Sequence, residues 1–359
     1  MTASGHDVLV DARMWGHPGI GRYVRELTGA MGRSGGSLGL GYILPSSIPP
    51  PGASPVVRCD RPIYDPREQF DLPRLSRSWR LLHSPHFNAP IFGRTPLVVT
   101  IHDLIYVTEP GAAPSAAARL YADALLASAV KRARRVIAVS EATRRDIVVR
   151  YGADERKIRV IHEAASGVFG RAAGGAPAEG GGGRKYVLFV GTLKPHKNPL
   201  SVTRALQALR RRGGPDVDLV IAGKIDPRHR ALADAVLGSQ GVRYAGAVSD
   251  EELVRLYRGA EALVQPSFKE GFGLPVLEAM SCGTPVIAAD RSSLPEVGGE
   301  AAQYFDPSQI DALERVLYNV LTDAKLRKDM SEKGIRRSET FTWQRTAERT
   351  VRVYEEALS

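Results

Sequence analysis

Short apolar segments alternate with amphipathic segments along most of the 359 residues, and a glycine-rich stretch divides this pattern into two runs. The first run predicts strands at 8–10, 97–101, 136–139 and 158–161, with helices at 21–31, 115–134 and 141–151. The second run predicts strands at 186–190, 217–222, 242–244, 263–264 and 285–288, with helices at 198–211, 227–237 and 250–258, and a mostly helical end. Alternation of this kind is typical of parallel, doubly wound α/β sheets.

The glycine-rich stretch, residues 171–184, has no apolar periodicity and has the composition of a flexible linker. A chain of this length suits two domains better than one core. We therefore predict two Rossmann-like domains, at 1–170 and 185–343. Such domains are expected to face each other across a cleft, with ligands at the carboxyl ends of the strands.

Composition narrows the class of protein further. No apolar run of about 18 residues is present, so no membrane span is predicted, and the N-terminus does not resemble a signal peptide. Cys59 and Cys282 are far apart in sequence and are expected to be reduced thiols, as in a cytoplasmic protein. The net charge is +10, and residues 1–168 hold 22 Lys and Arg against 15 Asp and Glu. The first half therefore suits an anionic partner, either a charged acceptor, a lipid phosphate or the inner face of a membrane.

Four basic residues end the helix predicted at 115–134 and are candidates for a peripheral contact with an anionic membrane: Lys131, Arg132, Arg134 and Arg135. Favourable positive charge at a helix C-terminus is the alternative explanation. Nucleic acid is not an expected partner, because no recognised nucleic-acid-binding motif accompanies the charge.

The segment from Glu270 to Glu278 joins two carboxylates through a Gly-Phe-Gly turn that opens a helix. Free N–H groups at the positive end of a helix suit a phosphate. Glu278 is placed to reach past that phosphate to a ribose, and Glu270 is placed to contact a sugar attached to it. A helix N-terminus with two solvated glutamates is the alternative.

This segment resembles the signature of the retaining nucleotide-sugar glycosyltransferases of the GT-B fold (family 4, group 1), in which seven residues separate two glutamates. The resemblance covers nearly the whole chain. It implies that Phe272, Gly273 and Leu274 bind the donor diphosphate through their backbone. It also implies that residues 344–359 cross back to the first domain, and that neither a metal nor a cofactor is needed.

The loop after the strand at 186–190 resembles the Gly-x-Leu…Lys-Asn loop of the family. Gly191 and Thr192 would then lie at the donor, and Lys197 matches the lysine that binds the donor phosphates. A solvated loop lysine is the alternative. Family members often hold an arginine just before this lysine, and some hold one after the glycine. Here those positions are His196 and Thr192, so one or two positive charges of the phosphate clamp are missing.

Two further loops resemble donor-side loops of the family. Gly19 and Gly21 match the N-terminal glycine loop that packs against the diphosphate and the acceptor, although a lone Gly-x-Gly usually marks only a turn. Val248 lies in a turn that resembles the base-recognition turn. Ser249 and Glu252 in that turn are also explained by a capping box.

His102 follows the strand predicted at 97–101 and matches a family histidine that contacts the donor sugar and the reacting centre. A core histidine bonded to Asp103 is the alternative. We interpret His86 and Asn88, together with His83, as an acceptor-side loop, and Asp103 as a further acceptor residue. The spacing of these histidines fits no standard zinc motif, so no metal site is predicted.

Together these features predict a retaining, metal-independent hexosyltransferase with Glu270 and His102 as its catalytic residues. The leaving diphosphate needs no proton, so the resemblance implies a front-face substitution rather than the paired carboxylates of glycosidases. His102 would then orient the reactants rather than act as the main base.

The two glycine loops, at 19–23 and 191–195, look most like those of the mannosyltransferase-type branch, which makes GDP-mannose the first expected donor. UDP-glucose, UDP-N-acetylglucosamine and a dTDP-deoxysugar are alternatives. The acceptor hydroxyl is expected on a saccharide, a lipid-linked saccharide or a small molecule. A nucleotide-sugar-binding protein without transferase activity and a basic protein that binds membranes or polyanions are the rival functions.

Overall fold

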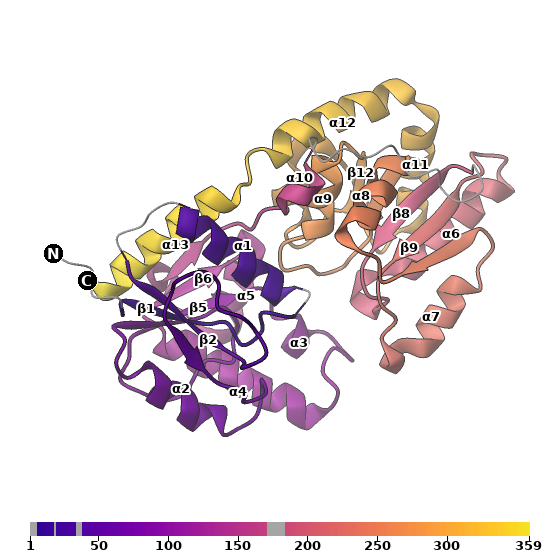
Figure 1. Cartoon of the computed structure of the whole chain (residues 1–359). Helices are drawn as coiled ribbons and strands as arrows, with labels where there is room; N and C mark the ends of the chain where they lie inside the picture. Colours follow the sequence, from indigo (N-terminus) through magenta and orange to yellow (C-terminus); the bar gives the residue numbers. More distant parts are fainter. Residues whose placement is uncertain (1–5, 18, 34–37, 171–183) are drawn as a thin grey trace. The chain divides into compact units, whose positions relative to one another are not determined.

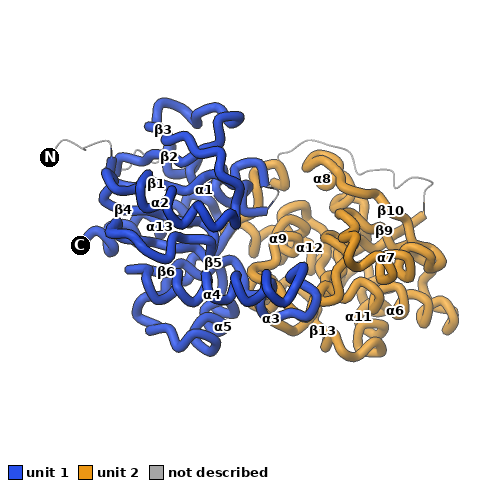
Figure 2. The backbone as a smooth tube through the Cα atoms, turned by 90° about the horizontal axis from the view of Figure 1, so that it is seen from below, with its two compact units in different colours: residues 1–163, 342–359 blue, residues 164–341 orange. Residues whose placement is uncertain are grey.

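The computed structural model describes residues 6–17, 19–33, 38–170 and 184–359, which form two compact units (Figure 2). Met1–Glu163 and Thr342–Ser359 form the first unit, and Ala164–Phe341 form the second. The predicted linker, 171–184, lies outside the described residues except for Arg184. None of the helices within the described ranges is long and apolar enough to cross a membrane.

The first unit is built on a seven-stranded sheet with the order β3-β2-β1-β4-β5-β6-β7, in which every pairing is parallel (Figure 1). Its strands are β1 (Val8–Asp11), β2 (Leu40–Leu44), β3 (Val56–Arg58), β4 (Leu81–Ser84), β5 (Leu97–Ile101), β6 (Arg135–Ala138) and β7 (Ile158–Val160). Its helices are α1 (Ile20–Arg33), α2 (Glu68–Ser76), α3 (Ile105–Thr108), α4 (Ala116–Arg132), α5 (Glu141–Tyr151) and α13 (Trp343–Leu358). Strand order reverses between β1 and β4, which is where doubly wound sheets bind ligands.

One expectation in this unit is wrong. His83 was expected in an acceptor-side loop, whereas it lies in β4 and is completely buried. Its Nδ1 lies 2.7 Å from the hydroxyl of Tyr354, and its Nε2 lies 2.9 Å from that of Thr100. Burial lowers the pKa of His83 to about 3, so it is a neutral core residue with both nitrogens satisfied.

The C-terminal helix α13 packs in the first unit, against α1 and the strands β4, β5 and β6 (Figure 1). Besides the Tyr354–His83 contact, Thr346 donates to the carbonyl of His162 at 2.8 Å. The guanidinium of Arg134 donates to the carbonyl of Ala357 at 2.6 Å. Residues more than 180 positions apart in sequence are therefore tied together by specific polar contacts.

The second unit holds a six-stranded parallel sheet with the order β10-β9-β8-β11-β12-β13. Its strands are β8 (Tyr186–Val190), β9 (Asp218–Ala222), β10 (Val242–Gly246), β11 (Ala262–Gln265), β12 (Val286–Ala289) and β13 (Ala302–Phe305). Its α-helices are α6 (Pro199–Arg211), α7 (Arg230–Leu237), α8 (Asp250–Gly259), α9 (Leu274–Ser281), α10 (Leu294–Gly298), α11 (Ile310–Thr322) and α12 (Ala324–Ser338). Two doubly wound parallel sheets, as predicted, are thus confirmed.

The N-terminal segment of the first unit ends at Glu163, seven residues before the boundary at 170 expected from the sequence. Phe169 causes this difference, because its buried ring packs edge-on against Tyr257 of α8, with the ring centroids 6.0 Å apart. The thiol of Cys282 also donates to the carbonyl of Phe169 at 3.4 Å. Apolar packing therefore binds this segment to the second unit.

Candidate active site

Among the candidate residues of the second unit, Glu270 makes the most side-chain hydrogen bonds through its carboxylate, and it is only 7% exposed. Lys197 Nζ lies 2.6 Å from each carboxylate oxygen. Gln265 Nε2 and Ser267 Oγ donate to Oε1 at 2.6 and 2.7 Å. Burial by itself would raise the pKa of Glu270, but the charge of Lys197 and these hydrogen bonds prevail and hold it below its ordinary value. Glu270 is therefore kept ionised and fixed in one orientation.

The backbone of Glu270 is held as firmly as its side chain. Ser292 Oγ donates to the Glu270 carbonyl at 2.7 Å, and Ser293 Oγ donates to it at 3.2 Å. The Glu270 N–H in turn donates to Ser292 Oγ at 3.2 Å. Ser292 has a φ of 57°, which is unusual for a residue other than glycine. Backbone strain of this kind accumulates at functional sites, where the surroundings enforce it.

Helix α9 begins at Leu274, four positions after Glu270, and its N-cap residue Gly273 is left-handed with a φ of 106°. A side chain there would also approach Leu294, whose Cδ2 lies 3.0 Å from the position of a Cβ. Phe272 is buried against the ring of Phe341. Within the described part of the chain, the N–H groups of Gly273 and Leu274 donate to no protein acceptor. The start of α9 thus offers two N–H groups to an anion.

Glu278 lies on the buried side of α9 and is 4% exposed. Its Oε2 accepts a hydrogen bond of 2.9 Å from the hydroxyl of Tyr257. The predicted contact with a ribose is not tested by these contacts. Glu278 shares with Glu270 the burial and bonding of a carboxylate that is held in place, rather than the solvation expected of a surface glutamate.

The loop from β8 to α6 contains Lys197 within a short 3₁₀ helix, Pro195–Lys197. Gly191 begins this loop with a φ of 149°, and Thr192 follows it. His196 is buried, and burial together with the adjacent lysine lowers its pKa to about 4. His196 therefore adds no positive charge near neutral pH.

Val248 lies between β10 and α8, outside the sheet. The expected capping box follows it: Ser249 Oγ accepts from the Glu252 N–H at 3.2 Å, and the Glu252 carboxylate accepts from the Ser249 N–H at 2.8 Å. The capping box is confirmed and accounts for Ser249 and Glu252. Base recognition near Val248 stays a prediction.

In the first unit, both imidazole nitrogens of His102 face acceptors. Nε2 lies 2.9 Å from the carbonyl oxygen of Pro85, which only accepts, and Nδ1 lies 2.8 Å from a carboxylate oxygen of Glu163. Two acceptors at these distances favour the imidazolium form of His102, in which both ring nitrogens donate. Burial would lower the pKa of His102, but the bond to Glu163 and its charge prevail and raise it.

The partner of His102 is therefore Glu163 and not Asp103. Asp103 Oδ1 instead accepts from the Ile105 N–H at 2.8 Å, at the start of α3. The ring of Tyr23 meets the His102 ring edge-on, with centroids 4.9 Å apart. Sequence reasoning missed Glu163, since 61 positions separate it from His102 and it belongs to no motif.

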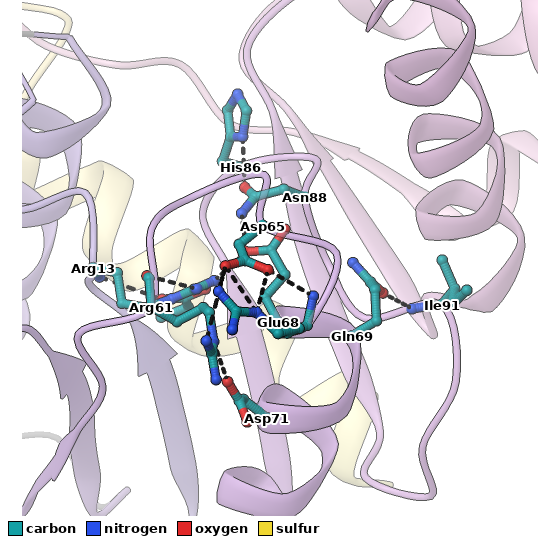
Figure 3. A network of polar contacts seen from close by, with 11 residues as sticks. Arg13, Arg61, Asp65, Glu68, Gln69, Asp71, His86, Asn88 and Ile91 are labelled. Atoms are coloured by element: carbon teal, nitrogen blue, oxygen red, sulfur yellow. Dashed lines mark hydrogen bonds and ion pairs between the residues drawn. The ribbon is translucent and has the colours of Figure 1, made fainter. Parts of the chain in front are cut away.

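His86 and Asn88 belong to a buried polar network at the end of β1 (Figure 3). His86 Nδ1 donates to Asn88 Oδ1 at 2.6 Å, and Asn88 Nδ2 donates to Glu68 Oε2 at 3.3 Å. Arg13 joins Glu68 at 3.0 Å and Asp11 at 2.7 Å. Burial lowers the pKa of His86 to about 3, so this histidine is neutral. Asn88 is bonded to both His86 and Glu68, and binding of an acceptor by either His86 or Asn88 stays a prediction.

The two glycines of the N-terminal loop differ in their surroundings. A Cβ on Gly21 would lie 2.4 Å from the carbonyl oxygen of Trp15 and 2.5 Å from that of Met14. Only glycine fits there, because helix α1 lies directly on the preceding turn. The Gly19 N–H donates to His17 Nδ1 at 3.3 Å, while Pro18 lies outside the described residues. Close packing explains Gly21 without a ligand, and donor binding by both glycines is untested.

The basic residues at the end of α4 are largely occupied. Arg132 donates to the carbonyls of Pro90 and Thr95, and Arg134 donates to the carbonyl of Ala357. Arg135 pairs with Glu356 at 2.8 Å, and the exposed members of the set are Lys131 and Arg134. These arginines fasten loops and α13 to the sheet. In the described ranges, no three His, Cys, Asp or Glu side chains gather so as to hold a metal ion.

Comparison with solved structures shows the GT-B architecture. The chain aligns with a glycosyltransferase from Rickettsia africae at 16% identity, a TM-score of 0.74 and 99% coverage of both chains. A sucrose-phosphate synthase from Thermosynechococcus elongatus aligns at 21% identity and a TM-score of 0.75, with 98% of both chains covered. The Anabaena protein HepE, in complex with UDP and glucose, aligns at 17% identity and a TM-score of 0.73, over 97% of this chain and 98% of HepE.

Sequence comparison identifies the family. The Glycosyltransferase Family 4 model matches residues 2–165, and the Glycosyl transferases group 1 model matches residues 178–337. O-antigen chain mannosyltransferase B of Escherichia coli is 32% identical over 292 residues, which cover 76% of this chain and 74% of that protein. An MMP α-(1→4)-mannosyltransferase of Mycolicibacterium hassiacum is 31% identical, covering 74% and 66%. The chain belongs to the family 4, group 1 glycosyltransferases.

Proposed function

We propose that the chain transfers a mannosyl group from GDP-mannose to a hydroxyl acceptor, with retention at the anomeric carbon and without a divalent metal. The pairing of Lys197 with Glu270 immediately before the open N-terminus of α9 is the observation that carries this proposal. The similarity to two mannosyltransferases supports the choice of the sugar. The acceptor we propose is a saccharide or lipid-linked saccharide.

The second unit would bind the donor. Lys197 and the N–H groups of Gly273 and Leu274 would stabilise the charge that develops on the leaving diphosphate. These donors are fixed before the reaction, so little reorganisation is required. Glu278 would accept from the ribose hydroxyls. Thr192 would contact the diphosphate, and the backbone near Val248 would contact the base.

Glu270 would orient the sugar rather than attack it. Both of its carboxylate oxygens are bonded to the Lys197 ammonium, and Oε1 also accepts from Gln265 and Ser267. A carboxylate so engaged is a poor nucleophile, and its low pKa makes it a poor acid. We therefore favour front-face substitution, in which the leaving phosphate takes the proton of the acceptor hydroxyl.

His102 of the first unit would supply positive charge and a fixed orientation to the reacting groups. With both nitrogens donating, it has no lone pair with which to accept a proton from the acceptor. His86 and Asn88 are our candidates for contacts with the acceptor. Their network fixes the ring of His86 from behind.

Thermal unfolding in EDTA, with GDP, UDP, dTDP and ADP and their sugar conjugates, tests the donor. A ligand that binds only the folded chain stabilises it by about 2.7 kcal/mol at a hundredfold excess over Kd. We expect stabilisation by GDP-mannose that is lost in Glu278→Ala. Absence of a shift with every nucleotide would refute the donor site. Binding without turnover by any acceptor would favour the rival, a nucleotide-sugar-binding protein.

A further inference from the structure

An exposed apolar surface on the first unit is formed by side chains that have no assigned role in the reaction. Phe70 of α2 is 69% exposed, Ile91 is 49% exposed and Phe92 is 43% exposed. The rings of Phe70 and Phe92 pack edge-on, with their centroids 5.4 Å apart. Large aromatic side chains that are mostly exposed yet packed on one another commonly mark an interaction surface.

Specific contacts hold the segment 91–95 along α2, so that the two form one surface. The Ile91 N–H donates to Gln69 Oε1 at 2.8 Å, as Figure 3 shows. A Cβ on Gly93 would lie 3.2 Å from the Cβ of Pro73, and Thr95 Oγ1 donates to the Ser76 carbonyl at 3.0 Å. Residues 91, 93 and 95 therefore follow α2 from its first turn to its end.

Three arginines extend this surface: Arg74, Arg77 and Arg94 are all exposed. Arg74 lies four positions after Phe70, on the same side of α2, and Arg77 directly follows the helix in a helical backbone conformation. Within the described residues, none of the three guanidinium groups has an ion pair or a side-chain hydrogen bond. The two acidic groups that most closely precede Arg74 in sequence, Glu68 and Asp71, are already bound by Arg13 and Arg61.

We propose that this face, made of Phe70, Arg74, Arg77 and residues 91–94, docks on the surface of an anionic lipid bilayer. Aromatic rings are stable in the interfacial region of a bilayer, and unpaired guanidinium groups bind lipid phosphates. Burial of the aromatic rings and attraction of the arginines to lipid phosphates then act together, because either contribution alone seldom gives stable membrane binding. The proposal concerns a surface distinct from the donor residues and does not depend on the identity of the donor.

The test is flotation of the full chain with vesicles of phosphatidylcholine, with and without phosphatidylglycerol. We expect binding only to the vesicles that contain phosphatidylglycerol, and weaker binding as salt rises. Replacing Arg74, Arg77 and Arg94 by Gln should lower the affinity about fivefold for each arginine. Phe70→Ser with Phe92→Ser should lower it roughly tenfold or more.

Arg315→Gln with Tyr318→Ser, on α11 of the second unit, is the matched control, because Tyr318 is a comparably exposed aromatic residue. It should bind vesicles like the wild type. All variants are first checked for wild-type circular dichroism and melting. The proposal is overturned if the wild type does not float with phosphatidylglycerol at low salt, or if the Phe70/Phe92 variant floats as well as the wild type. Self-association of the wild type and of the Phe70/Phe92 variant is measured in parallel. If the variant loses concentration-dependent self-association but still floats, the face binds a second copy of the chain instead.

Discussion

Lys197 Nζ contacts both oxygens of the Glu270 carboxylate at 2.6 Å, and this ion pair is enclosed in the second unit. Removing one partner from a buried pair leaves an uncompensated charge. The ion pair is therefore formed without a bound donor. Lys197 thus already contacts Glu270, the residue that precedes the turn proposed to bind phosphate.

Lys197→Met should lower the free energy of unfolding by roughly 3 kcal/mol, because Glu270 loses its counter-ion. Chemical denaturation at pH 7 measures this. The double variant Lys197→Met/Glu270→Gln should recover most of the lost stability but not the affinity for GDP. Equal destabilisation in the single and double variants would show that the pair is not coupled.

Stability should fall as the pH is lowered through the titration of Glu270. Its pKa is below the ordinary 4.5, so its contribution is present above pH 4.5 and is lost as pH falls through the lower, folded-state value. Comparing wild type with the Lys197→Met/Glu270→Gln variant between pH 7 and pH 3 isolates this contribution. A difference that does not change with pH would contradict the assigned pKa.

His102 should titrate above pH 6.5 in the wild type and at a lower pH in Glu163→Gln, because the carboxylate that holds its proton is gone. Nitrogen chemical shifts of labelled histidine measure both values. A raised pKa stabilises the fold below pH 6.5, and this contribution is lost as pH rises through the folded-state value. If His102 were a general base, kcat/KM would rise as it loses its proton. We expect no such rise.

Tyr354→Phe should destabilise the chain by about 1–3 kcal/mol, since it leaves the buried Nδ1 of His83 without a partner. Thermal unfolding measures the loss. Tyr318→Phe is the control, because Tyr318 is exposed on α11 and its hydroxyl is free to bond water. An equal effect of both substitutions would show that the contact between α13 and β4 contributes nothing specific.

The sequence was sufficient where the signal is local. Ser249 caps helix α8 as predicted, since a cap needs only the residues of the first turn. The apolar strand at 97–101 also agrees with β5, because parallel strands buried on both faces are continuously apolar. Both doubly wound sheets followed from such signals.

The stretch from 40 to 84 was not predicted, although it contains β2, β3, α2 and β4. Pro73 lies inside α2, and helices with an internal proline are not expected from pattern alone. His83 was misplaced because its partners, Thr100 and Tyr354, come from distant parts of the chain. Glu163 was missed for the same reason.

The donor site at Glu270 and α9 is tested by calorimetric titration of GDP-mannose and of GDP, in EDTA, into the wild type and Glu270→Ala. We expect the wild type to bind GDP-mannose without metal. In Glu270→Ala, the part of the affinity that depends on the sugar should disappear, while GDP binds within about threefold of wild type, a difference under 1 kcal/mol. Equal affinity of both proteins for GDP-mannose, or binding that requires a divalent cation, would contradict this donor site.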